Sequence, residues 1–229
     1  MNLKLLSASL LLASALPCLA GGSVTNNPDN RPYFGIRLGG EITCPGDVNY
    51  KYRATEFGLD LWKNGGGVEF GVIYNQPLVC NLYIEPGLKF YYNAYSADLK
   101  ALDEYGDYEI GSDYVGKFGL RIPINFGYHF DFTDNLSLAI FTGPEIEFGL
   151  SAKEHTKAEG LKVSENLYGE EGIYNRVDVN WGIGVGLNIN RSFYVGLSGD
   201  IGLLNMYKKN DAGATFHENR VTLSIGYNF

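Results

Sequence analysis

The final nine residues of the chain alternate strictly between apolar and polar side chains. Apolar side chains stand at every odd position from Val221 to Phe229, and small or polar side chains stand at the even positions between them. Because successive side chains of a β-strand point to opposite faces, this pattern predicts a strand with one apolar and one polar face. The apolar face needs either a packing partner or an apolar solvent, and this requirement constrains the fold of the whole chain.

The same alternation occurs in seven further segments, each near the ~9–11 residues that a tilted membrane-spanning strand needs. The predicted strands are 33–42, 67–75, 82–93, 114–129, 136–150, 177–189, 193–203 and 219–229. Aromatic residues stand near both ends of the apolar faces, as in the interfacial belts of membrane proteins. In a soluble protein a second sheet or a helix would have to cover these faces, and the sequence offers no amphipathic helix for that purpose.

The connections between these segments alternate in length. The short ones are 76–81, 130–135 and 190–192, whereas the long, polar ones are 43–66, 94–113, 151–176 and 204–218. Short turns on one side and long loops on the other are typical of bacterial outer-membrane barrels, whose long loops lie outside the cell. We therefore predict an all-β fold, an eight-stranded antiparallel up-and-down transmembrane β-barrel with both termini in the periplasm.

The N-terminus has the features of a secretory signal. Lys4 precedes an apolar stretch at 5–16, and small residues precede a cleavage point after Ala20. The predicted organisation is a signal peptide at 1–20, a short periplasmic lead at 21–31 and the barrel at 32–229. Cys18 leaves a lipoprotein as an alternative, although Pro17 stands where a lipid-attachment motif prefers a small residue.

Two cysteines remain after cleavage, Cys44 and Cys80. An exported pair often forms a disulfide, but the predicted topology places these two at opposite ends of the barrel. Three prolines, Pro86, Pro123 and Pro144, lie inside predicted strands, where each removes a ladder donor. We expect each to mark a bulge or an irregular stretch.

The polar faces carry charges of both signs, which must be paired or hydrated inside a narrow barrel. If the turn after residue 129 centres near Thr133, Arg121 stands directly opposite Glu145, and the preceding hairpin similarly brings Glu69 near Lys89. Further candidates for lumenal ion pairs are Arg37, Asp178, Asp200 and Arg220. Since eight strands enclose little more than their own side chains, a plugged interior is expected. The alternative is a small polar pore in which an ion pair acts as a gate.

Catalytic, metal and nucleic-acid sites have little support in the sequence. The three histidines are His129, His155 and His217, and no Gly-x-Ser-x-Gly motif accompanies them. The acidic loop at 98–113 lacks the ligand spacing of a calcium loop. A net charge of −8 gives a polyanion no basis for binding. We predict no catalytic residue, no metal, no cofactor and no nucleic-acid partner.

Several segments together resemble the PorT-like outer-membrane β-barrel family. The segment 120–128 (LRIPINFGY) resembles its L-x-I-P strand, and 84–90 (IEPGLKF) resembles the P-G-L strand before it. Gly143-Pro144 resembles its G-P hairpin, and 177–186 resembles its glycine-repeat strand, with Asn180 where glycine is usual. The resemblance covers most of 33–229 and implies a barrel in which the strand prolines are family features. It brings no catalytic residue, and members differ in role, including participation in protein secretion.

The predicted function is that of a non-enzymatic, integral outer-membrane barrel with a structural or surface-interaction role through four long extracellular loops. A narrow porin for small solutes or ions, and an outer-membrane lipid hydrolase, are the alternatives. The expected partners are outer-membrane lipid, an unidentified extracellular ligand, and the barrel-assembly machinery, which would recognise the C-terminal strand through Tyr227 and Phe229.

Overall fold

A computed structural model describes residues 31–52, 55–97, 110–158, 161–170, 172–208 and 214–229. The predicted signal peptide, nearly all of the predicted lead and most of the acidic loop at 98–113 lie outside these residues. No helix in the described part of the chain is long and apolar enough to cross a membrane.

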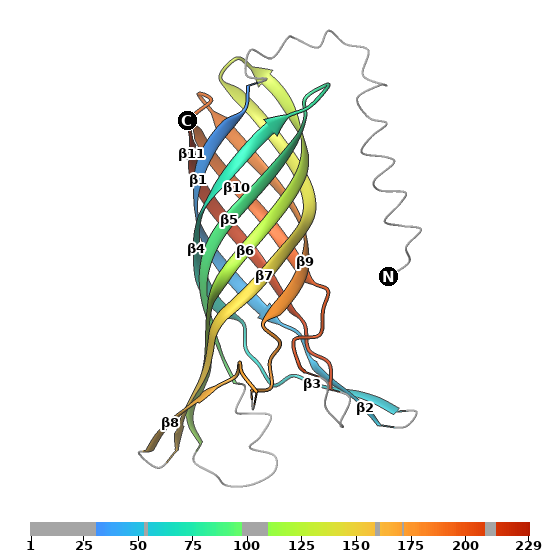
Figure 1. Cartoon of the computed structure of the whole chain (residues 1–229), viewed down its shortest axis with the longest axis vertical. Helices are drawn as coiled ribbons and strands as arrows, with labels where there is room; N and C mark the ends of the chain where they lie inside the picture. Colours follow the sequence, from blue (N-terminus) through green and yellow to red (C-terminus); the bar gives the residue numbers. More distant parts are fainter. Residues whose placement is uncertain (1–30, 53–54, 98–109, 159–160, 171, 209–213) are drawn as a thin grey trace.

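Eight antiparallel strands close into a barrel (Figure 1). Neighbouring strands pair in the cyclic order β1, β4, β5, β6, β7, β9, β10 and β11, and β1 pairs with β11 to complete the ring. This confirms the predicted fold class. Their bounds are β1 Tyr33–Pro45, β4 Gly65–Pro77, β5 Leu82–Ser96, β6 Ile110–Thr133, β7 Leu136–Ala158, β9 Val177–Ile189, β10 Phe193–Gly202 and β11 Glu218–Asn228.

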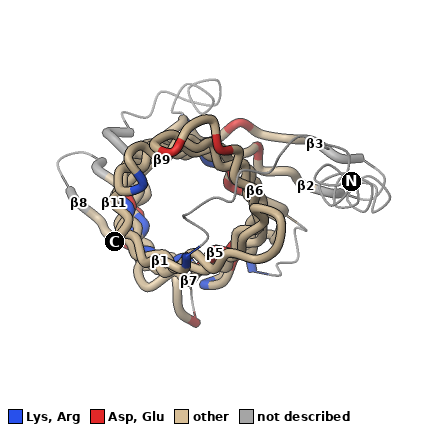
Figure 2. The backbone as a smooth tube through the Cα atoms, turned by 90° about the horizontal axis from the view of Figure 1, so that it is seen from above, with Lys and Arg blue, Asp and Glu red and all other residues tan. Residues whose placement is uncertain are grey.

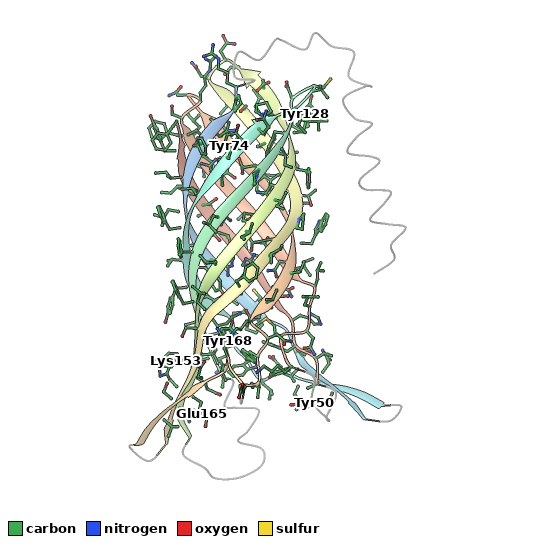
Figure 3. The ribbon with its side chains drawn as sticks, in the orientation of Figure 1. Tyr50, Tyr74, Tyr128, Lys153, Glu165 and Tyr168 are labelled. Carbon is green, nitrogen blue, oxygen red and sulfur yellow. The ribbon has the colours of Figure 1, made fainter. Side chains whose placement is uncertain are left out.

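The outer surface of the barrel is apolar, as the alternation predicts. On β11, Leu223 and Ile225 are 60% and 56% exposed, whereas Thr222 between β11's apolar residues is 2% exposed. The same separation holds on the other strands, and Figure 3 shows side chains projecting all around the wall. Tyr74 and Tyr128 lie at the short-turn end, where the sequence places one aromatic belt (Figure 3). The apolar face thus meets the surroundings of the barrel rather than a second layer.

The strands extend further than predicted at the long-loop end. β6 begins at Ile110 rather than 114, and β7 continues to Ala158, where it pairs with β8 (Leu161–Asn166). A separate hairpin joins β2 (Val48–Tyr52) to β3 (Thr55–Leu59), and both additions lie at the lower end of Figure 1. The apolar–polar alternation of the sequence ends before the strands do. Backbone hydrogen bonding between strands can continue beyond the membrane, where neither face of the strand has to be apolar.

The three strand prolines produce interruptions without bulges. Pro86 faces Ile124, and Pro123 faces Glu145, in the same register as the pairs on either side. Next to each of these pairs, however, two consecutive positions of the strand have no paired residue on the neighbouring strand. Since proline lacks the N–H but tolerates an extended backbone, the ladder loses a bond while the strand keeps its register. Of the two expected outcomes, a bulge or an irregular stretch, the structure shows the irregular stretch. The register shifts between β6 and β7 lie elsewhere, between Ile110/Asp113, Phe118/Gly119 and Asp131/Thr133.

Candidate functional site: the charged lumen and its two ends

The polar faces of the strands meet inside the barrel and bring twelve charged side chains together. Viewed along the barrel axis, the strands form a ring that carries charges of both signs (Figure 2). All twelve side chains are at most 17% exposed. The basic members are Arg37, Lys89, Lys117, Arg121 and Arg220, and the acidic members are Glu41, Glu69, Glu85, Glu145, Glu147, Asp200 and Glu218.

Arg121 on β6 is the hub of this network. Its Nη1 and Nη2 donate to the two carboxylate oxygens of Glu41 at 2.5 and 3.2 Å. Its Nε donates to Glu147 at 3.0 Å, and its Nη1 donates to Glu69 at 3.3 Å. The guanidinium carbon also lies 3.9 Å from the centre of the Tyr91 ring. A planar, five-donor guanidinium can hold three carboxylates at once, which an ammonium could not do with the same geometry.

The predicted pairing of Arg121 with Glu145 needs a correction in register. Arg121 stands directly opposite Glu147, and Glu145 lies one step along the same face, with its Oε1 3.8 Å from the Arg121 Nε. The pairing of Asp131 with Ser137 centres the turn at 134 rather than at Thr133. A shift of one residue in a turn centre moves the cross-strand partner by two residues and preserves the face. The face was therefore predicted correctly, but the partner was not.

The predicted contact between Glu69 and Lys89 occurs diagonally. Lys89 Nζ lies 2.8 Å from Glu69 Oε1, although the residue directly opposite Lys89 is Gly71. A long ammonium side chain reaches past the glycine, because no side chain stands in its way.

Arg220 and Asp200 are direct cross-strand partners, and Arg220 Nε lies 3.3 Å from the Asp200 carboxylate. Arg220 also contacts Glu145 and reaches Glu147 at 3.3 Å. Nearer the short turns, Arg37 Nη1 donates to Asn228 at 2.9 Å, and its Nη2 lies 4.0 Å from Glu85. These arginines extend the network towards both ends of the barrel.

Asp178 was grouped with the lumenal ion pairs, and the structure places it differently. It lies at the start of β9, and its Oδ1 accepts hydrogen bonds from the backbone N–H groups of Val179 and Leu204 at 2.7 and 3.3 Å. Its partners in the described part of the chain are therefore backbone donors, and it caps the β10–β11 connection rather than pairing with a cation.

Five members of the network are not among the predicted ion pairs, although all but the last follow the predicted inward alternation: Glu41, Glu85, Lys117, Glu147 and Glu218. Lys117 donates to Glu218 at 2.7 Å and lies 3.4 Å from Glu147. Glu218 was assigned to a loop, but it continues the inward phase of β11 two residues before Arg220. Extending the alternation by one step would have found it.

The lumen holds very little free space among these charges. A cavity of about 40 Å³ lies beside Lys89, Glu145 and Asp200, which is room for only a few water molecules. Each of the five cations lies within 4.0 Å of a carboxylate. Breaking one such buried contact by removing a partner typically costs about 3–5 kcal/mol. The interior is therefore cross-linked by pairs that resist separation.

The long-loop end is closed by a second cluster, which we call the aromatic plug. Tyr174 and Phe216, at the centre of the plug, are fully buried, and their rings stack 6.2 Å apart. Burial raises the pKa of Tyr207, which packs against both, to about 12, so this phenol stays neutral at physiological pH. The plug consists of Val48, Tyr95, Val115, Ala152, Leu167, Tyr168, Tyr174, Met206, Ala214 and Phe216, with Tyr50, Leu61, Trp62 and Tyr207 packed against it.

The plug and the charged network are joined by hydrogen bonds. The Tyr95 hydroxyl donates to Glu218 at 2.8 Å and lies 3.3 Å from the Tyr174 hydroxyl. Because Glu218 also accepts from Lys117, one path of contacts runs from the loop residues to the centre of the barrel.

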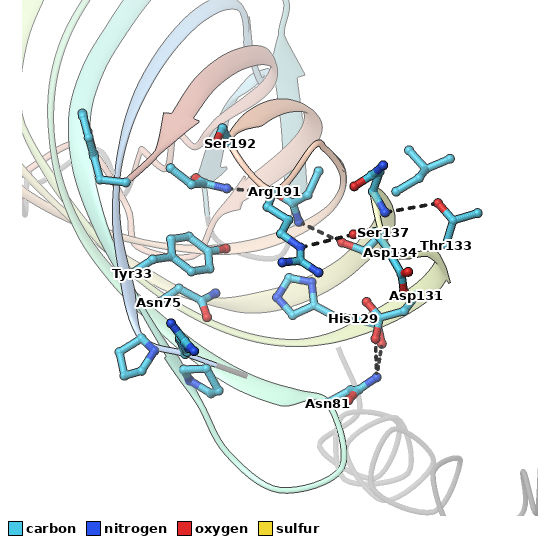
Figure 4. Close-up of a pocket in the computed structure, with 18 of the residues that line it drawn as sticks. Tyr33, Asn75, Asn81, His129, Asp131, Thr133, Asp134, Ser137, Arg191 and Ser192 are labelled. Carbon is cyan, nitrogen blue, oxygen red and sulfur yellow. Dashed lines mark hydrogen bonds between the residues drawn. The ribbon is translucent and has the colours of Figure 1, made fainter. Parts of the chain in front are cut away.

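The short-turn end holds a cavity of about 290 Å³, much larger than the space among the lumenal charges (Figure 4). Turn residues around Asn81, Asp134 and Arg191 form its rim. The two cysteines fit this layout, since Cys44 is near the end of β1 at the long-loop side and exposed Cys80 lies in the turn between β4 and β5. Both are free, as their predicted positions require.

Metal-binding and histidine clusters are not evident in the described residues. No group of three or more His, Cys, Asp or Glu side chains there is arranged to hold a metal ion. His129 stacks on the ring of Tyr83 at 4.3 Å, and His155 stacks on the ring of Tyr114 at 4.7 Å.

The family described as "Outer membrane protein beta-barrel domain" has a sequence model that matches residues 26–208. No curated protein is similar enough to the chain to count as a match. The solved structure of Ail, the attachment invasion locus protein of Yersinia pestis, is 14% identical, with 87% of this chain and 99% of that chain covered and a TM-score of 0.40.

Two further solved structures are similar at the same level. OprG from Pseudomonas aeruginosa is 8% identical, with 86% and 96% of the two chains covered and a TM-score of 0.43. The outer membrane enzyme PagL is 13% identical, with 83% and 97% covered and a TM-score of 0.43. Similarity this weak says nothing about the role of this chain.

Proposed function

The chain belongs to the outer membrane protein β-barrel domain family and lies in the outer membrane, and from this premise we propose that it is a non-enzymatic, non-conducting barrel that presents a rigid loop platform to the outside. The aromatic plug is the observation that carries the proposal. It draws residues from all four long connections or the strand ends beside them, and it packs them into one buried cluster. Loops fixed in this way lose little conformational entropy on binding, which suits a surface that recognises a ligand or a partner.

The charged network supports the non-conducting part of the proposal. An ion that crossed the lumen would have to displace pairs such as Arg121–Glu41 and Lys117–Glu218, and then pass the plug. Separating buried pairs costs several kcal/mol each. A narrow porin remains the alternative, and it requires both the network and the plug to open.

The hydrolase alternative has less support. Two of the three histidines, His129 and His155, stack on tyrosine rings, which suits packing. The PorT-like motifs support placing the chain in that narrower group, and we infer this placement from residues 84–90, 120–128 and 177–186. No role in secretion follows from it.

Single-channel recording in planar lipid bilayers tests the proposal. The full-length mature protein is expected to insert without stable conductance steps. A double variant, Tyr174→Ala with Phe216→Ala, opens the plug but leaves the ion pairs in place, so we expect it to remain silent as well. Stable steps from the wild-type protein that disappear with Glu145→Ala or Arg121→Ala would instead establish the gated pore.

A further inference from the structure

The three prolines within the barrel strands each remove one hydrogen bond, and the losses fall on three successive strand pairs. In an antiparallel ladder, directly opposite residues alternate between bonded and non-bonded pairs. Leu78 N donates to Leu82 O, so counting in steps of two makes Tyr74 and Pro86 a bonded position of β4 and β5. Pro86 has no N–H to donate, and the Tyr74 carbonyl therefore loses its ladder donor.

The same count identifies the second loss, between β5 and β6. His129 N donates to Asn81 O at the end of that ladder. Gly87 and Pro123 then stand at a bonded position, and the Gly87 carbonyl loses its ladder donor. Neither of these two opposite pairs is formed in the ladders of the described strands.

The third loss lies beside the second. Adjacent residues of a strand bond to opposite neighbours, so Ile124, which follows Pro123, bonds to β7. There it stands opposite Pro144, with which it does not pair in the described ladder, and its carbonyl loses its donor as well. Pro86 and Gly87 are likewise adjacent in β5. The losses at Tyr74–Pro86, Gly87–Pro123 and Ile124–Pro144 thus form one continuous line from β4 to β7, which we call the proline line.

The inner side of the proline line has little side-chain cover. Gly87 and Gly143 lie on the inward phase of their strands, and a Cβ on Gly143 would overlap the Ile124 carbonyl oxygen. The inner cavity of about 40 Å³ lies directly behind, since Pro123 and Gly143 are among its lining residues. Lys89 lines the same cavity, and its side chain is 17% exposed. A wall that lacks backbone bonds therefore separates this charged cavity from the membrane.

Towards both ends of the barrel, other barriers close the inner cavity. The aromatic plug fills the long-loop end. Towards the short turns, the Arg37 guanidinium stacks on the Tyr194 ring at 4.0 Å, and both side chains are at most 9% exposed. These two residues line the inner cavity but not the larger cavity at the short-turn end. Among the barriers around the inner cavity, the wall at the proline line is the one that lacks ladder bonds.

We propose that the barrel wall opens locally along the proline line and gives water-sized molecules a lateral route between the inner cavity and the membrane. The line starts beside Tyr74, at the short-turn end of the barrel (Figure 3). Segments with fewer hydrogen bonds open at a lower free energy than their surroundings. A carbonyl without a donor is costly in lipid, and in the open state water satisfies it. The route concerns the wall rather than the loops and does not depend on the function proposed above.

Amide hydrogen exchange of the full-length mature protein in lipid nanodiscs, followed residue by residue by NMR, tests this proposal. After correction for intrinsic rates, the amides of Gly87 and Ile124 should exchange at least tenfold faster than those of Leu197 and Leu223. The latter two residues are directly paired in the uninterrupted β10–β11 ladder. Equal protection at the two places overturns the proposal.

Restoring one donor tests whether the missing bonds are the cause. Pro123→Ala supplies an N–H opposite the Gly87 carbonyl, and exchange of the Gly87 amide should slow about fivefold, the effect of one further bond of about 1 kcal/mol. Pro77→Ala is the matched control, because the Pro77 nitrogen turns away from β5 and lies beyond the β1 ladder, which ends opposite Asn75. No slowing with folded Pro123→Ala, or equal slowing with the control, contradicts the proposal.

Thiol labelling tests whether the opening leads into the inner cavity. Ser198 lines this cavity from β10, away from the proline line. In a background of Cys44→Ser and Cys80→Ser, Ser198→Cys should react with methyl methanethiosulfonate, a small uncharged reagent that enters the membrane. Adding Pro123→Ala should slow this reaction about fivefold. No reaction at all, or a rate that Pro123→Ala leaves unchanged, rules out the lateral route.

Heat-modifiable migration on gels shows which variants fold. Should Pro123→Ala fail to fold, Pro144→Ala takes its place, because it supplies an N–H opposite the Ile124 carbonyl. Exchange of the Ile124 amide and labelling of Ser198→Cys are then the two readouts, and both should slow about fivefold. Unchanged rates in that variant overturn the proposal.

Discussion

Replacing Arg121 by methionine should be among the most damaging single changes in the lumen. Arg121 contacts Glu41, Glu69 and Glu147 at hydrogen-bonding distance. Glu69 keeps Lys89 after the change, and Glu147 keeps Lys117 and Arg220. Glu41 has only Arg121 as a cation among the contacts that the described residues show. The variant therefore leaves one buried carboxylate uncompensated, and we expect a loss of about 3–5 kcal/mol in the free energy of unfolding.

The double variant Arg121→Met with Glu41→Met tests whether the uncompensated charge is the cause. Two apolar side chains of similar length replace the pair, so the double variant should recover at least half of the loss. The measurement is urea unfolding from lipid vesicles followed by tryptophan fluorescence. Arg31→Met, an exposed arginine at the short-turn end, is the control and should stay within about 0.5 kcal/mol of the wild type. A single variant as stable as the wild type, or a double variant less stable than the single, would refute this reasoning.

Three further predictions follow from the packing and the topology. Phe216→Ala should lower the free energy of unfolding by about 3–5 kcal/mol, because it opens a cavity in the plug. It should also make the long loops more sensitive to protease, and unchanged digestion would show that the plug does not hold them. Gly149→Val should displace the Tyr168 ring, because the new Cβ would overlap the Tyr168 hydroxyl. Gly40→Val, whose Cβ would meet nothing within 4 Å, is the control, and urea unfolding compares the two variants. A membrane-impermeant maleimide should label exposed Cys80 only after the outer membrane is permeabilised, and labelling in intact cells would reverse the orientation.

The inward and outward faces of the strands could be predicted from sequence. Lipid on the outside and charged side chains on the inside require apolar and polar residues to alternate along each strand. The outward set on β11 and the inward position of Arg220 follow from that alternation alone. The partners could not be predicted so well. Glu147, and not the predicted Glu145, stands opposite Arg121. The choice between them depends on the centre of one turn, which the alternation of apolar and polar residues does not determine.

The ends of the barrel were the least predictable part. The aromatic plug joins residues from separate connections, such as Val48, Tyr174 and Phe216, with no local pattern to link them. Asp178 follows the inward alternation, but its carboxylate accepts from the backbone N–H groups of Val179 in β9 and of Leu204 in the connection after β10. The cavity at the short-turn end depends on how three turns pack against one another, and the sequence of each turn does not predict that packing.

Depth-resolved quenching by brominated lipids most directly tests whether lipid touches the outside of the barrel and the charges lie within it. Single tryptophans would be placed at Leu223 and at Thr222, neighbours on β11 with 60% and 2% exposure, in a background of Trp62→Phe and Trp181→Phe. Strong quenching at 223 with little at 222 is the predicted result. Equal quenching at both positions, or stronger quenching at 222, would contradict the account.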